Sequence, residues 1–150
     1  AAGFALAMVK KLMNDQRGWA IQMFSDGVCA ELSWSGTGPG PSLAQIISIL
    51  LCPYYGGTNG YASLHGAFDI RDDHKWEETS TLMVTDGEFS LKDDELNTLL
   101  PRKQKGERIA MILVGGSGRI HSLRKIGDDV YRVRKNELGV QLVAVSKDLL

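Results

Sequence analysis

The sequence predicts an α/β sandwich with a mostly parallel sheet and one antiparallel edge. Two short runs rich in apolar and β-branched residues, 81–85 and 109–114, are typical of strands buried on both faces of a parallel sheet. Amphipathic helical segments alternate with the strand segments along the chain. A pair of strand-like segments, 19–24 and 28–34, is joined by a short turn, and this pair supplies the antiparallel edge.

Composition narrows the class of protein. The chain has 150 residues, 43% hydrophobic and 23% charged, which is enough for one globular domain with a proper core. A formal net charge of -1 argues against electrostatic binding to nucleic acid or to an anionic membrane. No apolar run approaches the length of a membrane span. Cys29 and Cys52 are expected to be buried, reduced thiols, which favours a cytoplasmic location.

The first third of the chain predicts a helix, a strand pair and a second helix. The first helix is apolar over most of its surface and needs a preceding element to cover it. We therefore expect an N-terminal strand to be missing from the start of this sequence. Ser42 is expected to cap the second helix. The expected elements are a helix over 2–14, strands over 19–24 and 28–34, a loop over 35–41 and a helix with its apolar face at Leu43, Ile46, Ile47, Leu50 and Leu51.

The remaining segments continue the alternation of helix and strand. The expected elements are a helix over 59–68, a polar connection over 72–78, a central strand over 81–85, a helix over 91–99 stopped by Pro101, a strand over 109–114, a short helix over 120–126, a short strand over 130–133 and a tail over 138–150 of either type.

Two segments carry residues that suit a metal ion. Asp86 follows the apolar strand 81–85, and open α/β sheets place their ligand sites at the carboxyl ends of strands. Less than thirty residues earlier, Gly56-Gly57-Thr58-Asn59 forms a glycine turn that leads into a helix. A threonine hydroxyl and a carboxylate are suitable ligands for a hard cation such as Mg²⁺.

The order of these pieces resembles a von Willebrand factor A domain, and it looks closest to the ViaA and CoxE-like branch. The resemblance implies a Rossmann-like three-layer sandwich over 1–150 with a metal-ion-dependent adhesion site (MIDAS), in which Thr58 and Asp86 bind the metal. It also implies loop support from Gly56, Gly57, Asn59, Gly87 and Glu88. The segments that carry the resemblance are FALAMVKKL, IQMFSDGVCAELS, GGTNGYASL, LMVTDGEFS and RIHSLRKIGDDVYRV.

This sequence departs from the family pattern in two places. The first metal loop of the family, Asp-x-Ser-x-Ser, should precede the first helix and is absent from these residues. Asn59 stands where the branch often has aspartate, which keeps an oxygen but loses a charge. Both departures predict that this chain by itself binds the cation weakly.

The function implied by the resemblance is a non-enzymatic interaction module. Magnesium would keep an open coordination position, which an acidic side chain of a protein client completes. Members of the branch work with MoxR-type AAA+ ATPases, so we expect this domain to be an adaptor for such an ATPase. Two alternatives stay open: a metal-assisted hydrolase on a Rossmann-like sheet, and a degenerate, metal-free structural domain.

Each candidate residue also has a simpler interpretation. Asp86 could be a turn or helix-capping aspartate, and Thr58 could be the N-cap of the helix that follows it. Ser25 and Asp26 are expected to form a plain turn. Glu88 could be a solvated loop glutamate.

Two further segments are assigned no site. Gly115–Gly118 is expected to be a flexible loop at the same sheet edge, because it lacks the dinucleotide fingerprint. The basic stretch of Arg102, Lys103, Lys105 and Arg108 is expected to be a solvated linker.

Overall fold

The computed structural model describes residues 2–53, 56–86, 89–115, 120–134 and 136–149. They form a mixed α/β protein with one antiparallel and one parallel sheet. The chain divides into two compact units, Ala1–Gly66 and Ala67–Leu150. The α/β class is therefore confirmed, whereas the Rossmann-like three-layer sandwich stays a prediction.

The first unit contains the predicted strand pair and two helices. Strands β1 (Trp19–Phe24) and β2 (Val28–Trp34) are antiparallel, with Trp19 opposite Trp34. The register shifts between Met23 and Phe24, so a bulge lies directly before the turn. Helices α1 (Ala2–Asn14) and α2 (Leu43–Leu50) flank the strands in sequence, and α3 (Gly60–His74) begins in this unit. In the described chain this pair forms a two-stranded antiparallel sheet, and its place at the edge of a larger sheet stays a prediction.

A small hydrophobic core joins α1, α2 and the strand pair. Val9, Trp19 and Ile46 are buried at its centre. Of the predicted apolar face of α2, only Ile46 is buried, because Leu43 and Leu51 lie on the outer side and are 60% and 71% exposed. The partly buried side chains around the centre are Leu6, Leu12, Met13, Ile21, Leu32, Trp34 and Leu50.

The start of α2 follows directly from its sequence. The Ser42 hydroxyl accepts a hydrogen bond from the Gln45 amide at 3.3 Å, and the Ser42 amide donates to Gln45 Oε1 at 2.8 Å. This reciprocal capping box satisfies two amides that a helix start leaves without partners. The predicted N-cap is confirmed.

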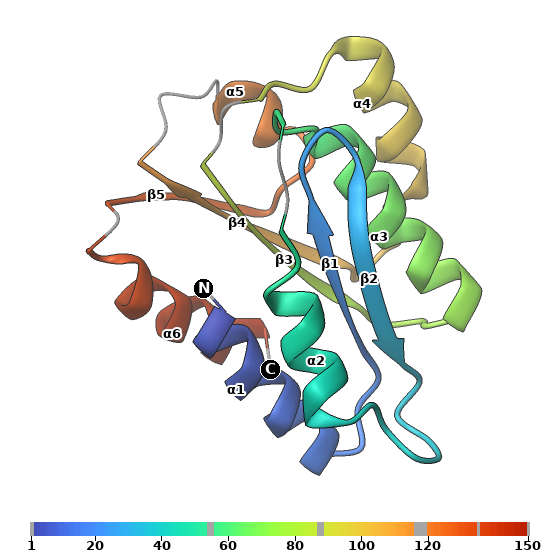
Figure 1. The fold of residues 1–150 in the computed structure, drawn as a ribbon. Coiled ribbons are helices and arrows are strands. Elements are labelled where there is room, and N and C mark those ends of the chain that lie inside the picture. Colours follow the sequence, from blue (N-terminus) through green and yellow to red (C-terminus); the bar gives the residue numbers. More distant parts are fainter. Residues whose placement is uncertain (1, 54–55, 87–88, 116–119, 135, 150) are drawn as a thin grey trace. The chain divides into compact units, whose positions relative to one another are not determined.

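The second unit is built on a parallel sheet. Strands β3 (Ser80–Thr85), β4 (Arg108–Val114) and β5 (Asp129–Val133) run in the spatial order β3-β4-β5. The connections carry α4 (Asp93–Leu99), a 3₁₀ turn η1 (Leu100–Arg102) and the short α5 (Ile120–Leu123), while α6 (Leu138–Leu149) follows β5 and packs against β4. Figure 1 shows α4 and α5 on one side of this sheet and α6 on the other. The tail over 138–150, for which the sequence left strand and helix open, thus forms helix α6 over 138–149.

The burial of the parallel strands differs from the prediction. Strand β4 is the middle strand, and its residues from Ile109 to Leu113 are at most 1% exposed. Strand β3 takes an outer position in the described three-stranded sheet, and only Met83 and Thr85 are buried. The two runs look alike in sequence because both are apolar, but only the middle strand has a hydrogen-bonded neighbour on each side. The expectation of a central, doubly buried strand over 81–85 is wrong for this sheet.

Two smaller expectations also need correction. Helix α3 continues to His74 instead of ending near Phe68, because its polar second half is held by ion pairs of Arg71 and Asp72. Cys29 is exposed and Cys52 is half-buried, so neither free thiol is in the core as predicted. Cys29 lies near the start of β2, next to Val28, which is also exposed.

Candidate cation site

The turn between β1 and β2 holds the glycine loop of the first unit. The Asp26 carboxylate accepts a hydrogen bond from the Gly57 amide, with an N···Oδ1 distance of 2.6 Å. The Asn59 amide donates to the Ser25 carbonyl at 2.6 Å, and Asn59 Nδ2 donates to the Asp26 carbonyl at 3.0 Å. Ser25 and Asp26 were expected to form a plain turn, yet this turn makes three specific bonds to a loop more than thirty residues away.

The two glycines of the loop are explained by the same carboxylate. Gly56 has a φ of +118°, which side-chain-bearing residues rarely adopt. A Cβ on Gly57 would lie 2.7 Å from Asp26 Oδ1, and a Cβ on Gly56 would overlap Oδ2. The Gly56-Gly57 pair is therefore required both for the bend of the backbone and for the close approach of Asp26.

Asn59 begins α3. Its side-chain Oδ1 accepts a hydrogen bond from the Ala62 amide at 2.9 Å, which is the N-cap contact of a helix whose first residue is Gly60. The alternative that Thr58 is the N-cap of this helix is thus wrong, because Asn59 is the N-cap. Thr58 itself is half-buried and lies between two residues that are both tied to the turn.

Removing the cap gives a measurable loss of stability. We expect Asn59→Ala to lower the free energy of unfolding by about 1 kcal/mol or more, because the Ala62 amide loses its acceptor and the Asp26 carbonyl loses the Asn59 Nδ2 donor. Urea unfolding at neutral pH measures the change. Asn97→Ala, at an exposed position inside α4, is the matched control and should cost nothing, since alanine favours helix there. Equal losses in the two variants would contradict the capping role.

Asp86 directly follows β3 in the second unit. It is exposed and outside the strand, and its Oδ1 accepts a hydrogen bond of 3.4 Å from the buried hydroxyl of Thr85. Because β3, β4 and β5 are parallel, Asp86 shares the carboxyl edge of their sheet with Gly115, which follows β4. Gly115 has a φ of +75° and donates its amide to the Val133 carbonyl. The carboxyl-end placement expected for Asp86 is therefore present within this unit.

Several predicted residues lie outside the described part of the chain. These are Gly87, Glu88 and the loop residues Gly116, Ser117 and Gly118. Thr58 belongs to the first unit and Asp86 to the second. Among the described residues, no group of three or more His, Cys, Asp or Glu side chains could hold a metal ion.

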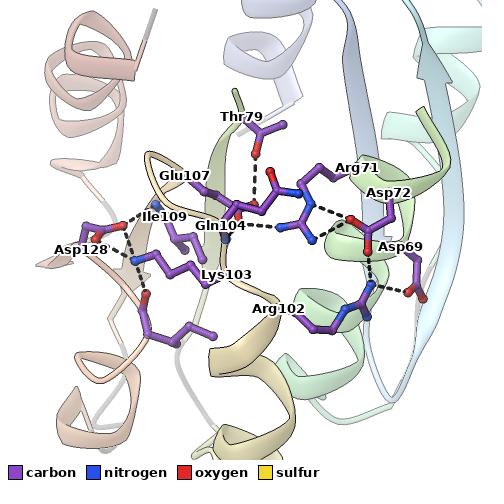
Figure 2. A network of polar contacts seen from close by, with 11 residues as sticks. Asp69, Arg71, Asp72, Thr79, Arg102, Lys103, Gln104, Glu107, Ile109 and Asp128 are labelled. Atoms are coloured by element: carbon purple, nitrogen blue, oxygen red, sulfur yellow. Dashed lines mark hydrogen bonds and ion pairs between the residues drawn. The ribbon is translucent and has the colours of Figure 1, made fainter. Parts of the chain in front are cut away.

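The amino ends of the parallel strands carry a buried ion pair that the sequence did not predict (Figure 2). Arg71 Nη1 lies 2.6 Å from Glu107 Oε2, and the two side chains are 5% and 2% exposed. Glu107 also accepts from the Thr79 hydroxyl at 3.0 Å and from the Gln104 amide at 3.1 Å. Glu107 thus ties its own segment before β4 to α3 through Arg71 and to the segment before β3 through Thr79, while the Gln104 bond is local.

The network continues outward from Arg71. Its guanidinium donates from Nε and Nη2 to Asp72 Oδ1, and Arg102 donates to Asp72 Oδ2 at 2.7 Å and pairs with Asp69 at 2.9 Å. Both guanidinium groups lie over the ring of buried Phe68, at 4.9 and 5.5 Å from its centre. The network packs against apolar surface as well as bonding to charges.

Lys105 is exposed, as expected for a solvated linker, but the other three cations of the basic stretch are in ion pairs. Arg102 pairs with Asp72, Lys103 with Asp128 at 2.7 Å, and Arg108 with Asp129 at 2.8 Å. Their acidic partners are 25 and more residues away for Arg102 and Lys103, so local charge patterning could not reveal them. The structure uses these cations to join loops at the amino edge of the parallel sheet.

Two of these carboxylates have a lowered pKa. The hydrogen bonds from Arg102 and Arg71 lower the pKa of Asp72. Burial by itself would raise the pKa of Asp128, but the bonds from Lys103 and the Ile109 amide outweigh it and lower that pKa. A carboxyl whose pKa is lower in the folded state than in the unfolded state stabilises the fold above the unfolded pKa of about 4.

Stability should therefore fall in acid. We expect the free energy of unfolding to decrease as the pH falls from about 4 through the lowered pKa values of Asp72 and Asp128. In Asp128→Asn, the decrease between pH 5 and 2 should be smaller than in the wild type. Urea unfolding across this range measures both; an identical pH profile in the variant would contradict the assignment.

Sequence reasoning missed Asp26, Arg71 and Glu107. For Asp26 a signal existed, because a paired glycine is the residue type that lets a carboxylate approach backbone amides, but nothing in the sequence says which carboxylate. For Arg71 and Glu107 no signal existed, since both lie in polar stretches that resemble solvated surface.

No family model and no solved structure matches the chain at a significant level. No helix in the described residues is long and apolar enough to cross a membrane.

Proposed function

We propose that this chain is a metal-ion-dependent protein-interaction module of the von Willebrand factor A type, with a Rossmann-like three-layer fold. Thr58 in the first unit and Asp86 in the second are each proposed as an oxygen ligand for Mg²⁺, and an acidic side chain of a protein client would complete the coordination. A MoxR-type AAA+ ATPase is the partner machinery, for which this domain is the adaptor.

The observation that carries the proposal is the placement of Asp86. Its exposed carboxylate follows the first strand of a parallel sheet at the carboxyl edge, where α/β proteins bind ligands. A second observation in the first unit supports the proposal. Three hydrogen bonds from Gly57 and Asn59, the neighbours of Thr58, to the turn at Ser25 and Asp26 hold the Thr58 loop at the start of α3.

The residues present fit a magnesium ion. A hydroxyl and a carboxylate are hard oxygen donors, and Mg²⁺ commonly takes few protein ligands while it keeps several waters. The bound ion would supply a positive charge that attracts a client carboxylate. Thr58 and Asp86 would orient it, and Gly56, Gly57 and Asn59 support the loop that carries Thr58.

The test is a titration of the full chain with Mg²⁺, followed by calorimetry. We expect weak but measurable binding, which Thr58→Ala lowers at least about tenfold and Thr58→Ser retains, because serine keeps the hydroxyl. Thr98→Ala removes an exposed hydroxyl on α4 and is the control. Binding that is unaffected by Thr58→Ala would contradict the proposal.

A second measurement addresses the partner. A MoxR-type AAA+ ATPase should bind the wild-type chain, and an acidic client peptide should bind the same chain in Mg²⁺ and be released by EDTA. Asp86→Ala should bind the acidic peptide no better than the chelated wild type. Binding that resists both the chelator and the substitution would favour the metal-free structural alternative.

A further inference from the structure

Thr58 has a neighbour on each side that is fastened to the turn between β1 and β2. Before it, the Gly57 amide donates to the Asp26 carboxylate at 2.6 Å. After it, Asn59 donates its amide to the Ser25 carbonyl and its side-chain Nδ2 to the Asp26 carbonyl. All of these contacts lie within the first unit. The backbone that carries the Thr58 hydroxyl is thus held from outside its own loop.

We propose that Asp26 is a positioning residue for cation binding: its carboxylate holds the Gly56-Gly57 backbone and so fixes where the Thr58 hydroxyl points. This inference rests on the function proposed above. A metal ligand must be held to within about half an ångström, and a glycine pair has no side chains that could hold its own backbone. Asp26 acts through Gly57 and is not itself assigned as a ligand.

The chemistry of the contact favours an acceptor oxygen at this position. A carboxylate that accepts from a backbone amide forms a charge-assisted bond, which is stronger than a neutral one. Both glycines are needed because a Cβ on either would meet the Asp26 carboxylate. Asparagine at position 26 would keep the acceptor oxygen and lose the charge, whereas alanine would lose both.

This difference allows a sharp experiment on the full, ¹⁵N-labelled chain. Mn²⁺ is the probe, and paramagnetic broadening of the Thr58 amide signal reports cation binding at this loop. We expect Asp26→Ala to weaken Mn²⁺ binding about tenfold and Asp26→Asn to retain most of it. Glu31→Ala removes another exposed carboxylate from the same strand pair and should leave binding unchanged.

A second readout needs no cation. Hydrogen exchange of the Gly57 amide should become about tenfold faster in Asp26→Ala, because that amide loses its acceptor. Gly57→Ala should disturb the wild-type loop, since its Cβ would press on the Asp26 carboxylate, and should disturb the loop less in the Asp26→Ala background. Additive effects of the two substitutions would contradict a direct contact.

The outcomes separate this inference from the proposed function. If Thr58→Ala and Asp86→Ala weaken Mn²⁺ binding while Asp26→Ala does not, the positioning role is overturned and the cation site remains. If Asp26→Asn is as weak as Asp26→Ala, the carboxylate acts by its charge and positioning is overturned. If Thr58→Ala and Asp86→Ala bind like the wild type, the cation site itself fails, and the inference falls with it even where Gly57 exchange responds.

Discussion

Glu107→Ala is expected to lower the free energy of unfolding by about 3–5 kcal/mol, the cost of breaking a buried ion pair by removing one partner. The substitution leaves the Arg71 guanidinium, only 5% exposed, without its closest carboxylate. It also removes the acceptor of the Thr79 hydroxyl and the Gln104 amide. Because domains are stable by only about 5–15 kcal/mol, this loss is a large fraction of the total.

Urea unfolding at neutral pH measures the effect. Glu78→Ala, at an exposed position shortly before β3, is the matched control and should change stability by about 0.5 kcal/mol or less. The double variant Arg71→Met/Glu107→Leu should lose less than the sum of its single variants, because no uncompensated charge stays buried. A loss below about 1 kcal/mol in Glu107→Ala would contradict this expectation and show that Asp72, which also pairs with Arg71, or water compensates the guanidinium.

Asp86→Ala is expected to weaken Mg²⁺ binding by about a hundredfold or more while the fold stays intact. Asp86 is exposed and lies outside β3, so its removal should change the free energy of unfolding only slightly in the absence of cation. Its carboxylate is the one charged ligand that the proposed site takes from this chain, and a charge contributes more to Mg²⁺ binding than a neutral oxygen does.

Calorimetry with Mg²⁺ and thermal unfolding separate the two effects. Asp73→Ala, an exposed carboxylate near the end of α3, has the same charge change and should retain Mg²⁺ binding. If Asp86→Ala loses both Mg²⁺ binding and the fold, Asp86 has a structural role and its assignment as a ligand is not supported. Full retention of binding would exclude Asp86 as a ligand.

Most helices and strands of the fold could be predicted from the local sequence pattern. The α1, β1 and β2 boundaries agree with the predicted ranges, and Ser42 caps α2. These features depend on hydrophobic periodicity and on capping chemistry within a few residues, which the sequence displays directly. The end of α3 was misjudged because its polar second half is stabilised by Glu107, which lies 36 residues beyond Arg71.

The candidate site divides in the same way. That Asp86 follows a strand of a parallel sheet could be predicted, because it depends on the apolar run before it and on the alternation of helix and strand. The hydrogen bond from the Gly57 amide to the Asp26 carboxylate could not be predicted from the sequence. The two residues are 31 positions apart, and exposed aspartates are common in turns.

The sequence by itself determined the α/β class, most element boundaries, the capping of α2 and the strand-end position of Asp86. Only the tertiary structure decided that β4 is the buried middle strand, that Arg71 and Glu107 form a buried pair, and that Asp26 holds the loop of Thr58. The reason is physical: periodicity and capping act over a few residues, whereas strand order and ion pairing depend on which distant segments meet when the chain buries its apolar surface.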